Sequence, residues 1–482
     1  MKSKTPILII SLVFIVCQFA FAELPQKFQD LIQRGEFTKC QQLMRRELAE
    51  NLEIYGCDRL ELVFEIERLE RIKKDFPNTI DAMLPGIKRY IPEVDSKMID
   101  TWEQNCALEF MRIDGKKFYF VEAVPNLFRI DRNARKRRQM VLEGNSDAKP
   151  ADEMPFSFEQ YIEQLLQVAA KTHGHFLSPK RFRISYTLTV KKDVVPPGKV
   201  IRCWLPFPRF RAGHQTAIRL ISTKPERRII APNHFLQRTV YLEKTAKPAQ
   251  PTRFQVFFHY TSHAIYRNIQ PEDIEPYRMD DALSPFVYER EPHIIFSDDL
   301  IAQSDKIVNG ETNPYLIAKK LFAWVDGNIP WASAREYSTI RNISGYAFRN
   351  SHGDCGIQTL LFITLCRMNG IPAKWQSGWT TEPESAGMHD WGEIYFEPFG
   401  WLPVDVSYGL RQSENPEVRW FYFGNLDVYR LVVNDDYSQP LYPAKIHPRS
   451  ETVDFQLGEV EWEGGNLYFD QWDYEFSVQY LD

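Results

Sequence analysis

Residues 353–372 read GDCGIQTLLFITLCRMNGIP, and the fold of this chain depends on them more than on any other stretch. Asp354 is a good helix N-cap, and Gly370 followed by Pro372 is a usual helix stop. Apolar residues between them recur at helical spacing over a wide face, which predicts a largely buried helix. Cys355 falls in its first turn, where unpaired backbone N–H groups and the helix dipole favour a thiolate. The Asp354 carboxylate works against this effect, so a thiolate here needs a positive partner.

A second stretch supplies the candidate partners. HDWGEIYF (389–396) and WLPVDV (401–406) are rich in aromatic and β-branched residues and flank a Pro/Gly turn, which predicts a β-hairpin. Thiol catalysis needs a base beside the sulfur and a third group that orients the base. His389 and Asp405 are residues of the right types, and the hairpin places them on neighbouring strands.

The hairpin must meet one geometric condition. Because alternate residues of a strand face opposite sides, His389 and Asp405 share a face only if paired residue numbers sum to an even value. A three-residue loop over 397–399, closed by a bulge at Gly400, would pair Phe396 with Gly400 and meet the condition. A regular four-residue loop would place Asp405 on the wrong face.

These motifs resemble the transglutaminase-like superfamily. The resemblance rests on Gly-Asp-Cys opening a helix that ends in Cys-Arg-x-x-Gly-Ile-Pro-Ala, on His-Asp-Trp-x-Glu-x-Tyr, and on Gly-Trp-x-Pro-Val-Asp. The spacing from cysteine to histidine and from histidine to aspartate is also similar. The resemblance covers Pro314 to Tyr408, under a quarter of the chain. It implies a papain-like core with Cys355 as nucleophile, His389 as base and Asp405 as the residue that orients His389.

The resemblance also implies a reaction. It is acyl transfer from peptide or protein amides through a thioester on Cys355, with water as acceptor in a peptidase or amidase, or an amine in transamidation. A glycan amidase of the peptide:N-glycanase type is a third chemistry on the same residues, and the sequence leaves the three open. The family's oxyanion hole pairs the nucleophile's backbone N–H with an upstream side chain, for which Trp331 and Tyr337 are candidates. No cofactor is implied, because the acidic loops of calcium-dependent relatives have no match here.

A different class of function stays open. The chain could be a non-catalytic binding or scaffold protein that retains a transglutaminase-like fold. The presence of all three residue types at Cys355, His389 and Asp405 argues against this alternative. A thiol locked in a disulfide, or a poorly aligned histidine–aspartate pair, would argue for it.

The first 22 residues have the pattern of a secretory signal peptide. A basic start precedes an apolar run at residues 7–16, and Ala20-Phe21-Ala22 is a small-x-small cleavage site. The apolar run is too short to span a bilayer, and no later segment is long and apolar enough. A lipoprotein anchor at Cys17 is disfavoured by the bulky Val16 before it. We therefore expect a secreted protein, periplasmic or extracellular if bacterial, with no transmembrane segment.

The 482 residues, 44% of them hydrophobic, suffice for about two to four domains. Apolar spacing near 3.6 predicts a mainly helical domain over 23–145, with a hairpin turn at Asp114-Gly115. Period-two alternation predicts an antiparallel β-sandwich over 178–268. The papain-like core follows at 285–435, and 436–482 are expected to form strands that pack back on that core. The predicted fold class is therefore α+β and multidomain.

Charge and histidine spacing give no sign of nucleic-acid or metal binding. The net charge is −5, and the basic run at residues 132–138 is typical of a solvated helix or linker. His259 and His263 are four residues apart, but on a strand that spacing separates them by about 13 Å. His173 and His175 have no acidic or cysteine cluster nearby, so no metal site is predicted.

The cysteines do not form a complete disulfide framework. Seven are present, and Cys17 leaves with the signal peptide. If Cys355 is free, an odd number remains, so full pairing is impossible. A Cys40–Cys57 pair is the one combination that the sequence leaves open.

Overall fold

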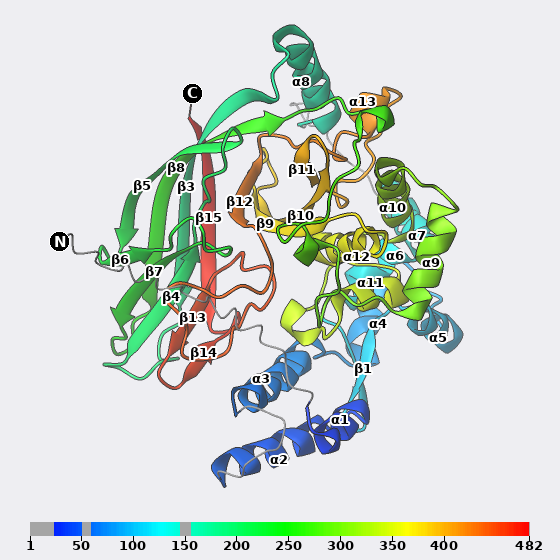
Figure 1. The fold of residues 1–482 in the computed structure, drawn as a ribbon. Coiled ribbons are helices and arrows are strands. Elements are labelled where there is room, and N and C mark those ends of the chain that lie inside the picture. Colours follow the sequence, from blue (N-terminus) through cyan, green and yellow to red (C-terminus); the bar gives the residue numbers. More distant parts are fainter. Residues whose placement is uncertain (1–23, 51–58, 145–155, 482) are drawn as a thin grey trace, which may run out of the picture.

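The computed structural model describes residues 24–50, 59–144 and 156–481 (Figure 1). The predicted signal peptide at 1–22 lies outside these residues. Cys57 does as well, while its suggested partner Cys40 is buried and carries a free thiol. Within the described residues, no helix has both the length and the apolar character needed to cross a membrane.

The N-terminal part of the chain is mainly helical and has its own hydrophobic core. The turn of its one hairpin is Asp114-Gly115, where φ is +49° and +81°. The favoured two-residue hairpin turn requires positive φ at both central residues, and this requirement explains why a glycine occupies position 115. The elements are α1 (Gln26–Gln33), α2 (Phe37–Ala49), α3 (Arg59–Asp75), α4 (Ile80–Lys88), α5 (Ser96–Gln104), β1 (Phe110–Ile113), β2 (Lys116–Tyr119), α6 (Ala123–Ile130) and α7 (Arg132–Gly144).

This helical part is held against the rest of the chain by buried polar contacts. Arg68 on α3 donates to the backbone carbonyl of Thr339 at 3.2 Å while pairing with Glu65. Asn126 on α6 donates to the carbonyl of Ser333 at 2.8 Å. Both acceptors lie in the segment just before the cysteine helix, so the helical part supports one edge of the candidate site.

Two antiparallel sheets form the β-sandwich, and a single helix, α8 (Phe158–Thr172), precedes them. Their strand orders are β15-β3-β8-β5 and β14-β13-β4-β7-β6. Along β8 every second residue is buried, which is the alternation expected of a sheet with one face in a core. The strands are β3 (Phe176–Val190), β4 (Val200–Pro206), β5 (Gln215–Lys224), β6 (Arg228–Ile230), β7 (Thr239–Thr245), β8 (Thr252–Ile265), β13 (Glu459–Trp462), β14 (Gly465–Leu467) and β15 (Trp472–Leu481).

The C-terminal strands differ from our expectation. We expected residues 436–482 to form strands that pack on the catalytic core. The strand β15 does contact that core, through Phe476 against Trp379, but it pairs with β3 over its whole length, and β13 pairs with β4. The long strand β3 leaves one edge open, and an open edge is a template for another strand. The C-terminal strands therefore complete the two sheets of the sandwich, as Figure 1 shows for β13, β14 and β15.

The core around the cysteine helix contains a four-stranded antiparallel sheet in the order β11-β10-β9-β12. Phe396 pairs with Gly400, whose φ of +76° suits a bulge, so the predicted three-residue loop is confirmed. A second helix, α10 (Pro314–Asn328), begins after the N-cap Asn313, whose side chain accepts from the backbone N–H groups of Tyr315 and Leu316. The elements are α9 (Asp298–Val308), α10 (Pro314–Asn328), α11 (Ile343–Asn350), α12 (Cys355–Met368), β9 (Ala373–Thr380), β10 (Gly387–Phe396), β11 (Gly400–Val404), α13 (Pro416–Arg419) and β12 (Arg430–Asn434).

The sandwich and this core share one hydrophobic cluster. Trp379 on β9 is fully buried and lies 5.1 Å from the ring of Tyr186 on β3 and 4.6 Å from that of Phe476 on β15. Gln215 on β5 exchanges hydrogen bonds with the backbone of Val432 on β12, at 2.8 and 2.9 Å. The sandwich therefore packs directly against the core and shares its hydrophobic interior (Figure 1).

Candidate active site

Cys355 is the first residue of α12, as the sequence predicted. The Asp354 side chain caps the helix by accepting from the backbone N–H of Ile357 at 3.1 Å. From Gly356 to Arg367 every residue of α12 is buried, whereas Cys355 is partly exposed. The sulfur therefore sits at the accessible end of a rigid, buried helix, the position that reactive cysteines use.

Carboxylates surround this sulfur. Cys355 Sγ donates to Asp390 Oδ2 at 3.3 Å. The hydroxyl of Tyr337 lies 2.6 Å from Asp354 Oδ1 and 3.3 Å from Asp390 Oδ2, so one phenol bridges the two carboxylates. Gly356 makes this approach possible, because a Cβ there would lie 2.2 Å from the Tyr337 hydroxyl oxygen. Gln456 donates to the second oxygen of Asp390 and, at 2.8 Å, to the carbonyl of His389.

The electrostatics of this cluster oppose a thiolate. Burial raises the pKa of the Cys355 thiol well above its ordinary value, and the neighbouring carboxylates Asp390 and Asp354 raise it further. Burial likewise raises the pKa of Asp354 to about 6 and that of Asp454 to about 7. The pKa of Asp390 is raised by burial and by its carboxylate neighbours. The helix position alone favours a thiolate, but these carboxylates outweigh it in this arrangement.

His389 and Asp405 meet in a second cluster. His389 Nε2 lies 2.7 Å from Asp405 Oδ2, and both side chains are buried. Arg430 on β12 donates to the same oxygen from Nη2 at 2.9 Å and from Nε at 3.2 Å. Although burial opposes ionisation, the charges of His389 and Arg430 hold the pKa of Asp405 at about 2, below its usual 3.8. The Tyr408 ring packs 3.9 Å from the Arg430 guanidinium and 4.9 Å from the imidazole, which fixes both groups in place.

The structure thus brings two of the three predicted residues, His389 and Asp405, into direct contact, while Cys355 contacts Asp390, the chain neighbour of His389. His389 and Asp390 are neighbours on β10 and point to opposite sides of the strand. The described hydrogen bond of Cys355 Sγ is to Asp390, and none joins it to the imidazole. Since Asp405 occupies Nε2, Nδ1 is the ring nitrogen that remains for a proton transfer with the sulfur.

The two candidate oxyanion-hole residues lie close to Cys355 in different settings. The Tyr337 hydroxyl is engaged by Asp354 and Asp390. Trp331 forms a parallel bridge with Gly353, and its side chain is 45% exposed. The Arg129 guanidinium of α6 lies over the indole at 5.0 Å, so the N-terminal helical part holds this ring in place.

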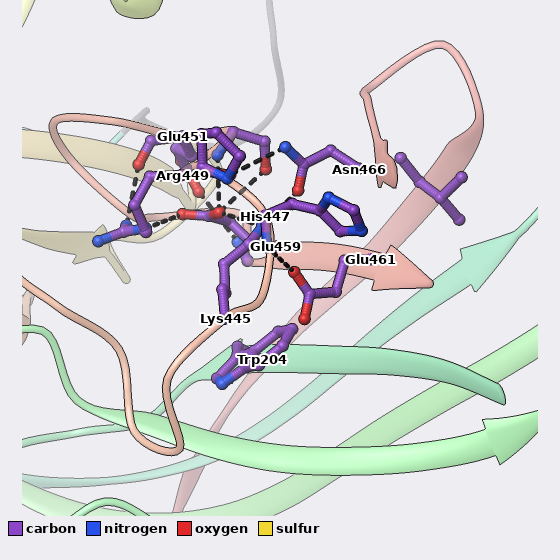
Figure 2. A network of polar contacts seen from close by, with 12 residues as sticks. Trp204, Lys445, His447, Arg449, Glu451, Glu459, Glu461 and Asn466 are labelled. Atoms are coloured by element: carbon purple, nitrogen blue, oxygen red, sulfur yellow. Dashed lines mark hydrogen bonds and ion pairs between the residues drawn. The ribbon is translucent and has the colours of Figure 1, made fainter. Parts of the chain in front are cut away.

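The segment that delivers Gln456 and Asp454 is anchored by a buried acidic residue. Glu459 on β13 accepts from Lys445 at 2.7 Å, from the Ser450 backbone N–H at 2.8 Å and from Arg449, as Figure 2 shows for the two cations. Burial opposes its ionisation, but the two cations hold the pKa of Glu459 at about 2. Glu451 in turn accepts from the backbone N–H of Gln456 at 2.8 Å. The loop between residues 445 and 459 is therefore held in place by these buried contacts where it meets the candidate site.

Sequence reasoning missed several residues of this site. Asp390 was visible beside His389, but nothing in the pattern indicated that it would bond to the thiol. Arg430 and Gln456 lie 25 residues beyond Asp405 and 66 beyond Asp390. No local motif marks either of them. In the part of the chain that the structure describes, no three His, Cys, Asp or Glu side chains are grouped in a way that could hold a metal ion.

Comparisons with known proteins bear on the core. Residues 301–406 match the family model described as the transglutaminase-like superfamily. No curated protein matches the sequence. Similar solved structures include a candidate cysteine protease from Cytophaga hutchinsonii, at 16% identity and TM-score 0.44, covering 64% of this chain and 92% of that one. Another is the periplasmic domain of TgpA from Pseudomonas aeruginosa bound to ethylmercury, at 14% identity and TM-score 0.26, covering 52% and 96%. The resemblance predicted for 314–408 is thus confirmed by the match of residues 301–406 to the model of the transglutaminase-like superfamily.

Proposed function

We propose that this protein is a thiol enzyme that transfers acyl groups from peptide or protein amides. Cys355 is the nucleophile, His389 the base and Asp405 the residue that orients the base. The thiolate attacks the amide carbonyl, the imidazolium returns the proton to the leaving amine, and a thioester forms on Cys355. Water then releases the acyl group in a peptidase or amidase, or an amine takes it in a transamidase. Export through the signal peptide at 1–22 belongs to the same proposal.

The observation that carries the proposal is the buried contact between His389 Nε2 and Asp405 Oδ2. At 2.7 Å, with Arg430 holding the carboxylate from the other side, it fixes the tautomer and the orientation of the imidazole. The histidine is the chain neighbour of Asp390, which touches the sulfur. The base and its orienting group are therefore already in place, and the proposed reaction further requires the sulfur to come within hydrogen-bond reach of the imidazole.

Trp331 is the better of the two candidates for the oxyanion hole. The Tyr337 hydroxyl is 2.6 Å from the Asp354 carboxylate, which engages its proton. The backbone of Trp331 pairs with that of Gly353, two residues before Cys355, and its side chain is partly open to solvent. The indole N–H would complement the backbone N–H of Cys355 in stabilising the developing negative charge.

A binding or scaffold protein is the second candidate function, and one observation favours it. The thiol is bonded to a carboxylate, and burial with Asp390 and Asp354 raises its pKa well above the ordinary value. A cysteine held in that state does not act as a nucleophile at neutral pH. The two candidates therefore differ in whether the thiol of Cys355 can reach the imidazole of His389.

The test is the pH dependence of alkylation of Cys355 by iodoacetamide, in the wild type and in His389→Ala. The extent of labelling is read at Cys355 by peptide mass mapping, because other free cysteines are present. A thiol that reacts below about pH 7 and loses this reactivity in His389→Ala supports the thiolate–imidazolium pair. Screening with peptide amides, with and without amine acceptors, then separates hydrolysis from transamidation. A thiol whose pH profile is the same in both proteins would favour the binding-protein account.

A further inference from the structure

Asp390 occupies a position that the proposed triad does not explain. Its Oδ2 accepts from Cys355 Sγ at 3.3 Å, so it touches the reacting atom itself. Gln456, which arrives from the loop before β13, holds the other oxygen and also the backbone carbonyl of His389. The carboxylate is buried, and its orientation is fixed by donors from three different parts of the chain.

The groups that face Asp390 are mostly acidic. From α12 come the thiol of Cys355 and the carboxylate of Asp354, and from the segment before it comes the hydroxyl of Tyr337. From the C-terminal loop comes Asp454, whose charge also disfavours ionisation of Asp390. No cation is hydrogen-bonded to Asp390 among the described residues. An ionised Asp390 therefore finds its stabilisation in hydrogen-bond donors alone, and the thiol proton is one of them.

We propose that Asp390 is a further residue of the reacting centre, whose carboxylate keeps the Cys355 thiol protonated until the sulfur turns to His389. Two negative charges 3.3 Å apart in a buried site are strongly unfavourable, so the cysteine and the aspartate together retain at least one proton. Catalysis then needs the sulfur to leave Asp390. The S–H bond breaks as an N–H bond forms on His389 Nδ1, and the products are a thiolate and an imidazolium with no change in total charge.

This inference rests on the proposed function, and it predicts the direction of a charge effect. Asp390→Asn keeps the size of the side chain and removes its charge. The amide oxygen can still accept from Gln456, and the amide N–H then faces the sulfur, where it stabilises a thiolate. We expect the alkylation rate of Cys355 at pH 7 to rise by about tenfold or more, which corresponds to a fall of about one unit in the apparent pKa of the thiol.

The matched control is Asp454→Asn. This substitution neutralises a second, partly buried carboxylate that faces the same cluster but makes no contact with the sulfur, so we expect the alkylation rate to stay within about threefold of wild type. Far-UV circular dichroism and tryptophan fluorescence check that both variants keep the fold. Cys355→Ser gives the background of labelling at the other cysteines.

The experiment is run as a cycle, with Asp390→Asn placed in the wild type and in His389→Ala. A faster reaction in both backgrounds supports the role of Asp390. An unchanged or slower reaction in the His389→Ala background overturns it, because there the charge of Asp390 acts on the thiol with no imidazole present. A His389→Ala substitution that has no effect in the Asp390→Asn background instead counts against the proposed triad and leaves the Asp390 result standing. The two ideas can therefore fail separately.

Discussion

Arg430→Gln removes a buried guanidinium that serves two buried carboxylates. Its Nη2 lies 2.9 Å from Asp405 and its Nη1 3.2 Å from Asp427, and none of the three side chains is exposed. Removing one partner of a buried ion pair costs about 3–5 kcal/mol, because the remaining charge is left uncompensated. The free energy of unfolding of a domain is about 5–15 kcal/mol. We therefore expect the variant to lose about a fifth or more of the stability of the core.

The pKa of Asp405 determines how the stability deficit of Arg430→Gln changes with pH. The pKa of Asp405 in the folded protein is about 2, below its usual 3.8, so Asp405 contributes stability above pH 4 and loses it as the pH falls towards 2. At about 1.4 kcal/mol per pKa unit, the contribution is about 2 kcal/mol at neutral pH. Without Arg430 the pKa of Asp405 rises, because burial then outweighs the remaining attraction to His389. The deficit of the variant should therefore be largest near pH 7 and shrink as the pH is lowered towards 4.

The assay is urea unfolding at pH 7, 5.5 and 4, followed by tryptophan fluorescence, in wild type and variant. Arg411→Gln is the matched control, because its pair with Glu159 is partly exposed and such pairs contribute about 1 kcal/mol or less. The reasoning would be refuted if Arg430→Gln cost no more than Arg411→Gln at pH 7. It would also be refuted if the deficit of Arg430→Gln grew on acidification.

Three further predictions concern the candidate site. Asp405→Asn removes the negative charge that faces His389 Nε2, so alkylation of Cys355 at pH 6 should fall by about tenfold or more while the circular dichroism spectrum is unchanged. Gly356→Ala places a Cβ 2.2 Å from the Tyr337 hydroxyl and should lower the unfolding midpoint markedly, whereas Gly387→Ala, with open space around it, should change it little. Asp454→Asn removes a carboxyl whose pKa burial raises to about 7 from its usual 3.8. Such a group costs stability progressively as the pH rises from about 4 to 7, so the stability of the variant relative to wild type should be greater at pH 8 than at pH 5 by about 2–3 kcal/mol. Equal differences at both pH values in urea unfolding would contradict the last prediction.

Local signals predicted the parts of the site that are local. The cap at Asp354 and the stop at Gly370 bracket α12. Counting residues in the hairpin loop was enough to put His389 and Asp405 on one face, since the register depends only on the loop length and the bulge at Gly400. These features are determined by residues a few positions apart, which a single sequence contains in full.

The features that the sequence did not predict depend on contacts between segments that are far apart in the chain. A strand pattern such as that of β15 indicates a strand and one buried face, but it does not identify the partner strand, which in the structure is β3. The same holds for Arg430 and Gln456, whose roles come from their placement opposite Asp405 and Asp390. The charge state of the thiol was the most misleading feature in the sequence. A helix N-terminus favours a thiolate, and only the tertiary structure shows how many carboxylates face it.

The carboxylate facing the thiol is itself held in place by the β-sandwich. Gln456 fixes the oxygen of Asp390 that does not face the sulfur, and the backbone of Gln456 is fixed by Glu451. That loop is anchored by Glu459, which lies on a strand of the sandwich sheet and is neutralised by Lys445 and Arg449 (Figure 2). If the protonation of Cys355 depends on Asp390, it depends on this chain of contacts as well. A core cut away from the sandwich would keep Cys355, His389 and Asp405 but would lose the clamp on Asp390, and its thiol should titrate differently from that of the full chain.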